Sequence, residues 1–360
     1  MNGIHGGDIY RNRVILDFSV NINPLGIPKA VTAALHNAAE SCSTYPDIEA
    51  EELRRAVSGM LSVPEDMLLF GNGASELFMA AVHALRPAKT VIPVPSFSGY
   101  EYAARAAGSK IIYYPMKEEE NFLPEKGLLE ELTEDVDLLF LGNPNNPTGA
   151  LMTREYLEAA LEHCRQRKIH VILDECFIGF CRRNSGGRTA SMISDISLYD
   201  HLILIRAFTK SFSIPGVRLG YLVCSNPELY HRIRRQLPEW NVSVFAQAAG
   251  IACAGEPGFL EKTASYVREE WYFLEEGLNK LGFRVYPGEA NFLLIREENS
   301  LVCTERPRLC HVKPLDERLL EHGILIRSCE NFRGLGTGYY RIAVKRREEN
   351  EILLKTMGEL

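Results

Sequence analysis

The middle of the chain repeats one pattern three times, in which a short apolar run is followed directly by residues suited to chemistry. Residues 138–141 lead into Gly-Asn-Pro-Asn-Asn-Pro-Thr-Gly (142–149), residues 171–173 lead into Asp174, and residues 202–205 lead towards Lys210. Prolines and glycines end such strands, and helical spacing over 153–168 separates two of the runs. This alternation predicts an α/β fold, with a mostly parallel sheet and helices on both faces. Ligands bind at the carboxyl ends of the strands in sheets of this kind.

Lys210 stands in the segment Arg-Ala-Phe-Thr-Lys-Ser-Phe-Ser (206–213), and Arg218 follows before a further apolar run ends at Val223. Burial beside another cation favours the neutral, nucleophilic form of a lysine, which is the form that attacks an aldehyde. Taken alone, such a lysine is more often a surface residue on a loop, and Asp174 could equally be a helix N-cap. The functional interpretation therefore depends on the order of the segments.

In the order Asn-Pro-Asn-Asn-Pro-Thr-Gly, Asp174, Lys210 and Arg218, these segments resemble the fold-type I, class I/II aminotransferase superfamily of pyridoxal 5'-phosphate (PLP) enzymes. The resemblance implies an aspartate aminotransferase-like fold with PLP as cofactor. Asp174 would keep the pyridine nitrogen protonated, and Asn146 would bind on the O3′ side of the cofactor. Lys210 would bond covalently to the cofactor and later move protons. Thr209 and Arg218 would bind the cofactor phosphate.

Three upstream segments extend the predicted cofactor site. One segment, Gly-Asn-Gly-Ala-Ser-Glu-Leu (71–77), follows an apolar run and begins a predicted helix. The free N–H groups at the start of such a helix would attract phosphate. An ordinary strand-to-helix turn would have the same sequence pattern. The resemblance assigns Ala74 and Ser75 to the phosphate of PLP. It places Phe97 on the pyridine ring, although an isolated Phe is more often a core residue. Tyr45, in Thr-Tyr-Pro-Asp, would reach the cofactor of a neighbouring subunit, so a homodimer would share its active sites.

The N-terminal residues resemble a narrower family. His5-Gly6-Gly7 and Asp-Phe-Ser-Val-Asn-Ile-Asn-Pro-Leu-Gly (17–26) are similar to the L-threonine-O-3-phosphate decarboxylases of cobalamin biosynthesis, which are relatives of histidinol-phosphate aminotransferase. Alternating polar and apolar residues that end in Pro and Gly predict an extended arm. In the superfamily this arm lies over the active site. The resemblance places His5, Asn23 and Asn146 at the substrate.

Arg327 and Arg341 each stand in an apolar, strand-like context. A buried arginine is costly unless an anion pairs with it, and an internal Asp or Glu could be that anion. By resemblance, Arg341 would bind the α-carboxylate of the substrate, and Arg327 would bind its phosphate with help from His5. A phosphorylated amino acid, which has two anionic ends, would explain both arginines.

Residue identity does not decide between decarboxylation and transamination, because the bond that breaks is the one held perpendicular to the cofactor ring. The N-terminal segments favour the decarboxylase, as do Arg-Ser-Cys (327–329) and Tyr-Tyr-Arg (339–341), and Phe177 replaces a tyrosine typical of histidinol-phosphate aminotransferases. Cys176, where the family usually has Ala, and an insertion near residues 298–313 depart from the pattern. We expect a PLP-dependent lyase that converts L-threonine O-3-phosphate to (R)-1-amino-2-propanol O-2-phosphate.

Two alternatives to this activity stay open, and a third is disfavoured by the sequence. They are histidinol-phosphate:2-oxoglutarate transamination, decarboxylation of serine phosphate, and ligand sensing in a PLP-dependent regulator. The regulator would need an N-terminal DNA-binding domain, for which the 30 residues before the first expected helix leave no room.

Composition limits the domain organisation and the partners. The 360 residues, of which 46% are hydrophobic, suffice for a large PLP-binding domain (31–255) and a smaller α+β domain formed by the N-terminal arm (1–30) and residues 256–360. A net charge of −7 argues against nucleic-acid binding.

The nine scattered cysteines indicate reduced thiols in the cytoplasm. Cys303, Cys310 and His311 lack a convincing fourth ligand, so no metal site is predicted. There is no signal pattern and no apolar run of membrane-spanning length, so we expect a soluble cytoplasmic protein without a membrane partner.

Overall fold

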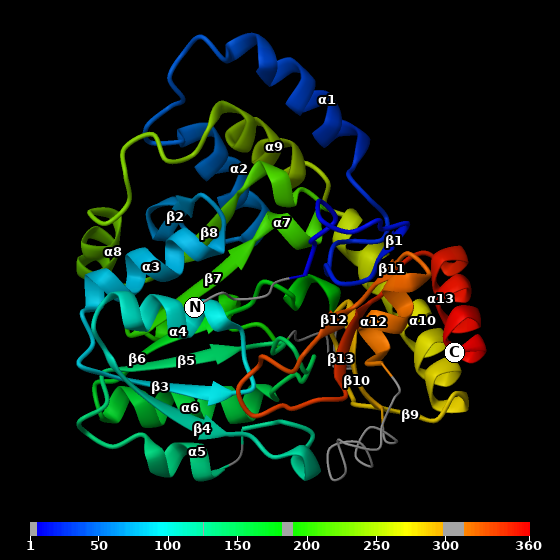
Figure 1. Cartoon of the computed structure of the whole chain (residues 1–360). Coiled ribbons are helices and arrows are strands. Elements are labelled where there is room, and N and C mark those ends of the chain that lie inside the picture. The colour runs from blue at the N-terminus through cyan, green and yellow to red at the C-terminus, as the bar shows by residue number, and fades with distance from the viewer. Residues whose placement is uncertain (1–5, 125, 182–189, 298–312) are drawn as a thin grey trace.

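A seven-stranded sheet forms the centre of the larger part of the protein (Figure 1). The computed structural model describes residues 6–124, 126–181, 190–297 and 313–360. The strand order is β2-β8-β7-β6-β5-β3-β4, and β8 alone runs antiparallel to its neighbours in this sheet. The strands are β2 (Leu68–Gly71), β3 (Lys89–Val94), β4 (Lys110–Pro115), β5 (Leu138–Gly142), β6 (His170–Asp174), β7 (Leu202–Ala207) and β8 (Gly220–Val223). The predicted mostly parallel sheet is therefore confirmed.

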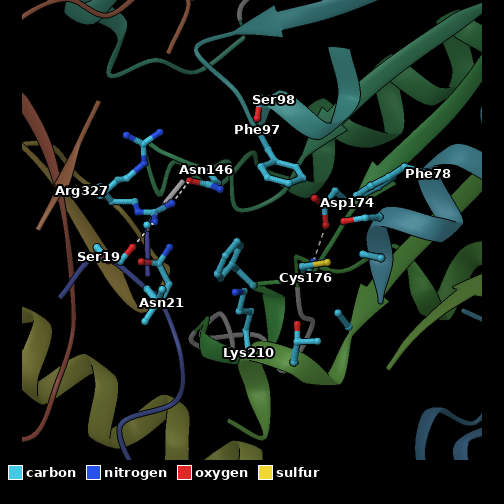
Figure 2. Close-up of a pocket in the computed structure, with 18 of the residues that line it drawn as sticks. Ser19, Asn21, Phe78, Phe97, Ser98, Asn146, Asp174, Cys176, Lys210 and Arg327 are labelled. Carbon is cyan, nitrogen blue, oxygen red and sulfur yellow. Dashed lines mark hydrogen bonds between the residues drawn. The ribbon is translucent and has the colours of Figure 1, made fainter. Parts of the chain in front are cut away.

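The sheet brings the chemistry-bearing residues to one edge. Because β5, β6 and β7 are parallel neighbours, their carboxyl ends lie side by side. Asp174 is the last residue of β6, and Lys210 lies in α7 (Phe208–Ser211), the short helix that follows β7. Figure 2 shows both side chains in the same pocket.

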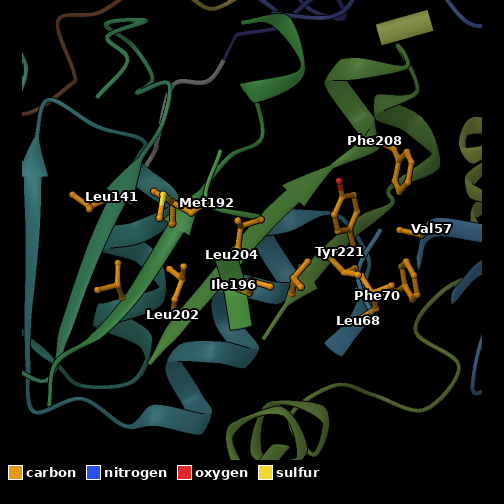
Figure 3. Packing of buried hydrophobic residues seen from close by; sticks show 14 of the residues in the cluster. Val57, Leu68, Phe70, Leu141, Met192, Ile196, Leu202, Leu204, Phe208 and Tyr221 are labelled. Atoms are coloured by element: carbon orange, nitrogen blue, oxygen red, sulfur yellow. The ribbon is translucent and has the colours of Figure 1, made fainter. Parts of the chain in front are cut away.

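Helices cover both faces of the sheet because the side chains of each strand alternate between two cores. Leu202 and Leu204 pack into one core, and Ile203 and Ile205 pack into the other. The first core, part of which is drawn in Figure 3, also takes side chains from α1 (Lys29–Ala38), α2 (Glu51–Leu61), α5 (Lys126–Glu131), α6 (Arg154–Gln166) and α9 (Val244–Ala254). The second takes them from α3 (Ala74–Leu85), α4 (Ser98–Ala106) and α8 (Pro227–Arg234).

Three of these helices have a side-chain cap at their N-terminus. Thr153, Asn226 and Ser243 precede α6, α8 and α9, and each side-chain oxygen accepts a hydrogen bond from a backbone N–H of the first turn. The helix expected over 153–168 is present as α6 and is a few residues shorter than expected.

A smaller antiparallel sheet, ordered β12-β13-β10-β9, lies beside the large one (Figure 1). Its strands are β9 (Phe283–Val285), β10 (Phe292–Glu297), β12 (Arg327–Ser328) and β13 (Tyr339–Ala343). The helices of this part are α10 (Phe259–Lys280), α12 (Leu315–Glu321) and α13 (Arg347–Glu359), and they share a core with the strands. We propose that this part and the N-terminal arm form the smaller domain, with residues 31–255 as the larger one.

The N-terminal arm is extended and joins the smaller sheet region to the active-site edge. Its strand β1 (Leu16–Asp17) pairs in parallel with β11 (Ile324–Leu325). Phe18 is fully buried, and its backbone N–H donates to Leu325 O at 2.7 Å while its carbonyl accepts from Ala343 N at 2.9 Å. Further on, Asn23 N donates to Lys210 O at 3.0 Å.

Two groups of residues considered from the sequence fall outside the described ranges. They are His5, which was expected at the substrate, and residues 298–312 of the insertion, where Cys303, Cys310 and His311 were weighed and no metal site was predicted. Among the described residues, none of the helices combines the length and the apolar character that crossing a membrane requires.

Candidate active site

A cavity of about 220 Å³ opens at the carboxyl ends of the central strands (Figure 2). Strand ends of the large sheet, the first turn of α3, the N-terminal arm and the smaller sheet all contribute to its wall. Ten of the thirteen residues predicted for the cofactor and substrate line this cavity: Ala74, Ser75, Phe97, Asn146, Asp174, Thr209, Lys210, Arg218, Arg327 and Arg341. The structure therefore brings together residues that are far apart in sequence.

One corner of the cavity is built to attract an oxyanion. Helix α3 begins after Gly73 without a side-chain cap, so the N–H groups of its first turn face outward. Arg218 lies against this turn, and a Cβ added to Gly73 would come within 2.4 Å of its Nη2 atom. Gly73 also has a φ of +79°, which favours glycine. A cation and a helix N-terminus thus converge beside Ser75 and Thr209.

Another part of the cavity wall carries a buried carboxylate, that of Asp174. Its Oδ2 accepts a hydrogen bond from Tyr100 Oη at 2.6 Å, and its Oδ1 accepts one from Cys176 N at 2.9 Å. Burial raises the pKa of Asp174, while the bonds from Cys176 and Tyr100 oppose that rise. A cationic nitrogen beside it would favour the ionised carboxylate further. Burial also raises the pKa of the Cys176 thiol, so this residue stays neutral.

Tyr100 is a residue of this site that the sequence did not suggest. It is buried in α4, stacks on Phe140 with ring centroids 4.9 Å apart, and meets the Phe97 ring edge-on at 5.7 Å. The Tyr100 side chain therefore orients both Asp174 and Phe97. Gly99 leaves room for the Phe97 ring, because an added Cβ would lie 2.3 Å from it.

We expect Tyr100→Phe to weaken the binding of PLP about tenfold, because a hydrogen bond to a charged acceptor contributes about 1.5–3 kcal/mol. The ring packing would survive, and the pKa of Asp174 would rise further. The dissociation constant of PLP, measured by titration of the cofactor-free protein, checks this. Tyr102→Phe is the matched control, since Tyr102 is in the same helix but 62% exposed. An equal effect of both substitutions would contradict the role given to Tyr100.

Lys210 lies on the cavity floor with its pKa lowered to about 8. Burial is the largest cause, and the charges of Arg341 and Arg218 add to it. Each of these influences disfavours the ammonium form. A substantial fraction of the amine is therefore neutral near pH 8, as a nucleophile requires.

This lowered pKa predicts how the attachment of PLP to cofactor-free protein depends on pH. The ammonium predominates below pH 8, so the rate of covalent attachment should rise with pH and reach half its maximum near 8. Arg341→Gln removes a neighbouring positive charge and should move the midpoint to higher pH. Stopped-flow absorbance measures the rate. A midpoint near the ordinary lysine value of 10.5 would contradict the assignment.

Arg327 and Arg341 form the third part of the cavity wall. They are direct partners across β12 and β13, and the exposed fraction of each is only 7%. Like charges placed opposite each other in a sheet are destabilising unless something neutralises them. Burial, together with the charge of Arg327, lowers the pKa of Arg341 to about 10.

The hydrogen bonds of Arg341 leave it ready for an anion. Its guanidinium donates to Asn146 Oδ1 at 2.5 Å and to the carbonyl of Ser19 at 2.8 Å, while its Nε is buried without a partner. Within the described ranges, no carboxylate lies at ion-pair distance from it. Arg327, in turn, donates to Asn331 Oδ1 at 2.7 Å and lies over the Phe332 ring.

The arm contributes Asn21 to the cavity in place of the predicted Asn23. Asn21 is buried and lines the cavity, and its Oδ1 has no hydrogen-bond partner. Asn23 does not line the cavity, because its Nδ2 donates to Ser211 O at 2.7 Å and to Thr263 Oγ1 at 2.8 Å. Asn23 therefore anchors the arm to the segment that carries Lys210.

The remaining two predicted residues are His5 and Tyr45. Gly6 lines the cavity and packs against Ser19, whereas its neighbour His5 is outside the described residues. Tyr45 is 81% exposed and does not line this cavity, and its ring lies 4.9 Å from that of Trp240.

These features fit pyridoxal 5'-phosphate, the cofactor that the sequence resemblance implies. The α3 turn with Arg218 suits its phosphate, Asp174 suits a protonated ring nitrogen, Phe97 offers an aromatic face, and Lys210 offers an amine for its aldehyde. We assign these roles as proposals.

The chain belongs to the aminotransferase class I and II family, whose model matches residues 13–357. It is 36% identical to the threonine-phosphate decarboxylase of Salmonella typhimurium, an alignment that covers 99% of this chain and 96% of that protein.

Solved structures of the same fold include both kinds of enzyme considered above. The histidinol-phosphate aminotransferase of Clostridium acetobutylicum matches with a TM-score of 0.85 and 32% identity, over 96% of this chain and 98% of that one. The L-threonine-O-3-phosphate decarboxylase of Porphyromonas gingivalis matches with a TM-score of 0.81 and 25% identity, over 96% of this chain and 99% of that one. The expected aspartate aminotransferase-like fold is therefore confirmed.

Proposed function

We propose that this protein decarboxylates L-threonine O-3-phosphate to (R)-1-amino-2-propanol O-2-phosphate, with PLP as cofactor, as a cytoplasmic homodimer. In the family that the sequence resembles, this product supplies the aminopropanol arm of cobalamin. The observation that carries the proposal is the buried pair Arg327 and Arg341, which face each other across β12 and β13 at the cavity that holds Lys210. A small substrate with an anion at each end suits two cations placed in this way. The 36% identity to a threonine-phosphate decarboxylase supports the same substrate.

Each residue has a distinct task in this proposal. PLP, when bound, withdraws the electron pair left at Cα after a bond there breaks. Arg341 binds the carboxylate with help from Asn146 and Asn21, and Arg327 binds the phosphate, so the two cations fix which bond at Cα faces the ring. Asp174 holds a proton on the ring nitrogen. Lys210, in its protonated ammonium form, then donates a proton to Cα and becomes the neutral amine.

Phe177 favours decarboxylation over transamination in this site. It lines the cavity, and it packs edge-on against Phe292 with ring centroids 5.1 Å apart. A phenyl ring there offers no hydroxyl for the cofactor oxygen, unlike the tyrosine expected in histidinol-phosphate aminotransferases. Transamination of histidinol phosphate remains the second candidate because of the structural likeness to an enzyme of that name.

Exposure of Tyr45 supports the proposed homodimer. A large aromatic side chain that is 81% exposed and does not line the cavity of its own chain suits a surface that a second copy covers. In the proposal, Tyr45 reaches the cofactor phosphate in the neighbouring subunit. Each active site then needs two chains.

A pair of parallel incubations tests the function. PLP-loaded protein with L-threonine O-3-phosphate is followed for CO₂ and amine, and with histidinol phosphate and 2-oxoglutarate it is followed for glutamate. We expect CO₂ in the first incubation and no glutamate in the second. Glutamate without CO₂ would overturn the proposal in favour of the aminotransferase. A third incubation with L-serine O-phosphate distinguishes the two phosphorylated substrates.

A further inference from the structure

A partly buried ionic cluster centred on Glu118 lies outside the cavity and joins the seven-stranded sheet to the four-stranded sheet. Glu118 stands in a short 3₁₀ turn (Glu118–Glu120) just after β4, the edge strand of the large sheet. Its carboxylate accepts hydrogen bonds from the hydroxyl groups of Tyr286 and Tyr339, the latter at 2.7 Å. Arg296 donates to both oxygens at 2.8 and 2.9 Å, and Arg284 lies 3.0 Å away. All four partners belong to the smaller sheet or its flanks.

Apolar packing surrounds this cluster. Met116 and Phe122, on either side of Glu118 in sequence, pack with Tyr286, Tyr339 and other buried residues of the smaller sheet. The Phe122 ring lies 5.3 Å from Tyr286, and the two tyrosine rings stack at 6.1 Å. The contact is therefore a small core between the two parts, with one carboxylate at its polar edge.

The cluster connects directly to the arginines of the cavity. Tyr339 and Arg341 are two residues apart on β13, so their side chains lie on the same face of the strand. Arg296 is the cross-strand partner of Tyr339 on β10. On the other side, Cys329 N donates to Tyr339 O at 2.8 Å, and this bond fixes the strand end that carries Arg327.

The carboxylate of Glu118 is the group on which the other four converge. Burial opposes its ionised form, but the hydrogen bonds from Tyr286, Tyr339 and Arg296 outweigh burial and lower its pKa. An ionised acceptor holds phenolic and guanidinium donors more strongly than a neutral amide of the same shape.

We propose that Glu118 is a positioning residue, which holds the strands bearing Arg327 and Arg341 at a fixed place relative to Asp174 and Lys210. Glu118 acts through Tyr339 and Arg296 and does not touch the substrate. This positioning determines the affinity for the substrate. A substrate with two anions binds well only while both arginines are held at the right separation from the cofactor residues. The inference rests on the proposed function, because it takes L-threonine O-3-phosphate as the two-anion substrate.

Glu118→Gln is the test, since glutamine keeps the shape and removes the charge. We expect KM for L-threonine O-3-phosphate to rise about tenfold, the scale of one weakened charge-assisted hydrogen bond, with kcat changed less than about threefold. The dissociation constant of PLP should stay unchanged. Glu120→Gln is the matched control, because Glu120 lies in the same turn and its carboxylate pairs with the nearby Lys117 at 2.9 Å.

Binding measured without turnover gives a second readout. In the Lys210→Ala background, calorimetry should show L-threonine O-3-phosphate binding about tenfold more weakly when Glu118→Gln is added. Tyr339→Phe keeps the ring packing and removes one donor, so it should shift KM in the same direction by a smaller factor. This variant keeps the test valid if Glu118→Gln does not fold.

Two outcomes separate the possible failures. An active Glu118→Gln or Tyr339→Phe protein with unaltered KM and a lowered Tm would overturn the inference, because Glu118 would then only stabilise the fold. Absence of CO₂ from the unsubstituted protein would instead overturn the proposed function. In that case the calorimetric comparison still reports whether Glu118 controls the binding of a two-anion ligand.

Discussion

Lys210→Ala is expected to abolish turnover and the absorbance of covalently attached PLP. The amine of Lys210 is the single nucleophile assigned to the cofactor aldehyde and also the group assigned to move the proton to Cα. Loss of a positioned proton-transfer group alone costs about 10²–10⁴-fold in kcat, and the loss of covalent attachment adds to that. Absorbance spectra of the PLP-loaded variant and a CO₂ assay measure both effects.

Lys210→Arg and Lys355→Ala complete this experiment. Arginine keeps the positive charge but stays protonated, so it should be as inactive as alanine. Lys355 is exposed on α13, and its replacement should leave both the spectrum and the rate unchanged. Turnover retained by Lys210→Ala would rule out the assigned role.

Arg327→Ala should raise KM for L-threonine O-3-phosphate by about 10²–10³-fold, because truncating one partner of a buried charge pair typically costs 2–5 kcal/mol. The loss should be much smaller for an amino acid without a phosphate, since Arg327 is assigned to that group alone. Binding constants for L-threonine O-3-phosphate and L-threonine, measured side by side, give the comparison.

Arg333→Ala is the control for Arg327→Ala. Arg333 lies a few residues further along the chain, half exposed, with its guanidinium over the Tyr113 ring. Its removal should leave phosphate recognition unchanged. Equal losses for the phosphorylated and unphosphorylated ligands in Arg327→Ala would mean that Arg327 does not bind the phosphate.

The sequence predicts those site residues that stand in a recognisable local pattern. Asp174 and Lys210 each follow an apolar run, and the register of a parallel sheet then brings such strand ends together. Tyr100 had no such pattern, because its contact with Asp174 spans 74 residues of sequence. The Glu118 cluster was invisible for the same reason, with contacts of up to 221 residues in separation.

The local backbone explains why Asn21 lines the cavity instead of the predicted Asn23. In a regular extended segment both side chains would lie on one face. Here Ile22 N donates to Val20 O at 3.2 Å, which closes a tight turn around Asn21, and Asn23 N donates to Lys210 O. A tight turn of this kind has no distinct sequence signal within an arm that otherwise alternates.

Helix α13 was also missed by the sequence analysis. Its first turn is charged, but the helix also has a buried side. Leu353 and Met357, four residues apart, are buried there together with Asn350. The buried Asn350 donates to Glu270 at 2.9 Å, and Glu270 also binds Arg347. Polar residues inside a core weaken the periodic pattern that marks a helix.

The contacts of the N-terminal arm determine when the active site can form during synthesis. Leu16 pairs with Ile324, and the carbonyl of Ser19 receives Arg341 across 322 residues of chain. Domains fold as they emerge from the ribosome, and contacts of such long separation form late. The N-terminal arm must therefore wait for β11 and β13, which follow every strand of the large sheet, before it can dock, so a nascent chain with a complete large sheet still lacks a closed substrate pocket.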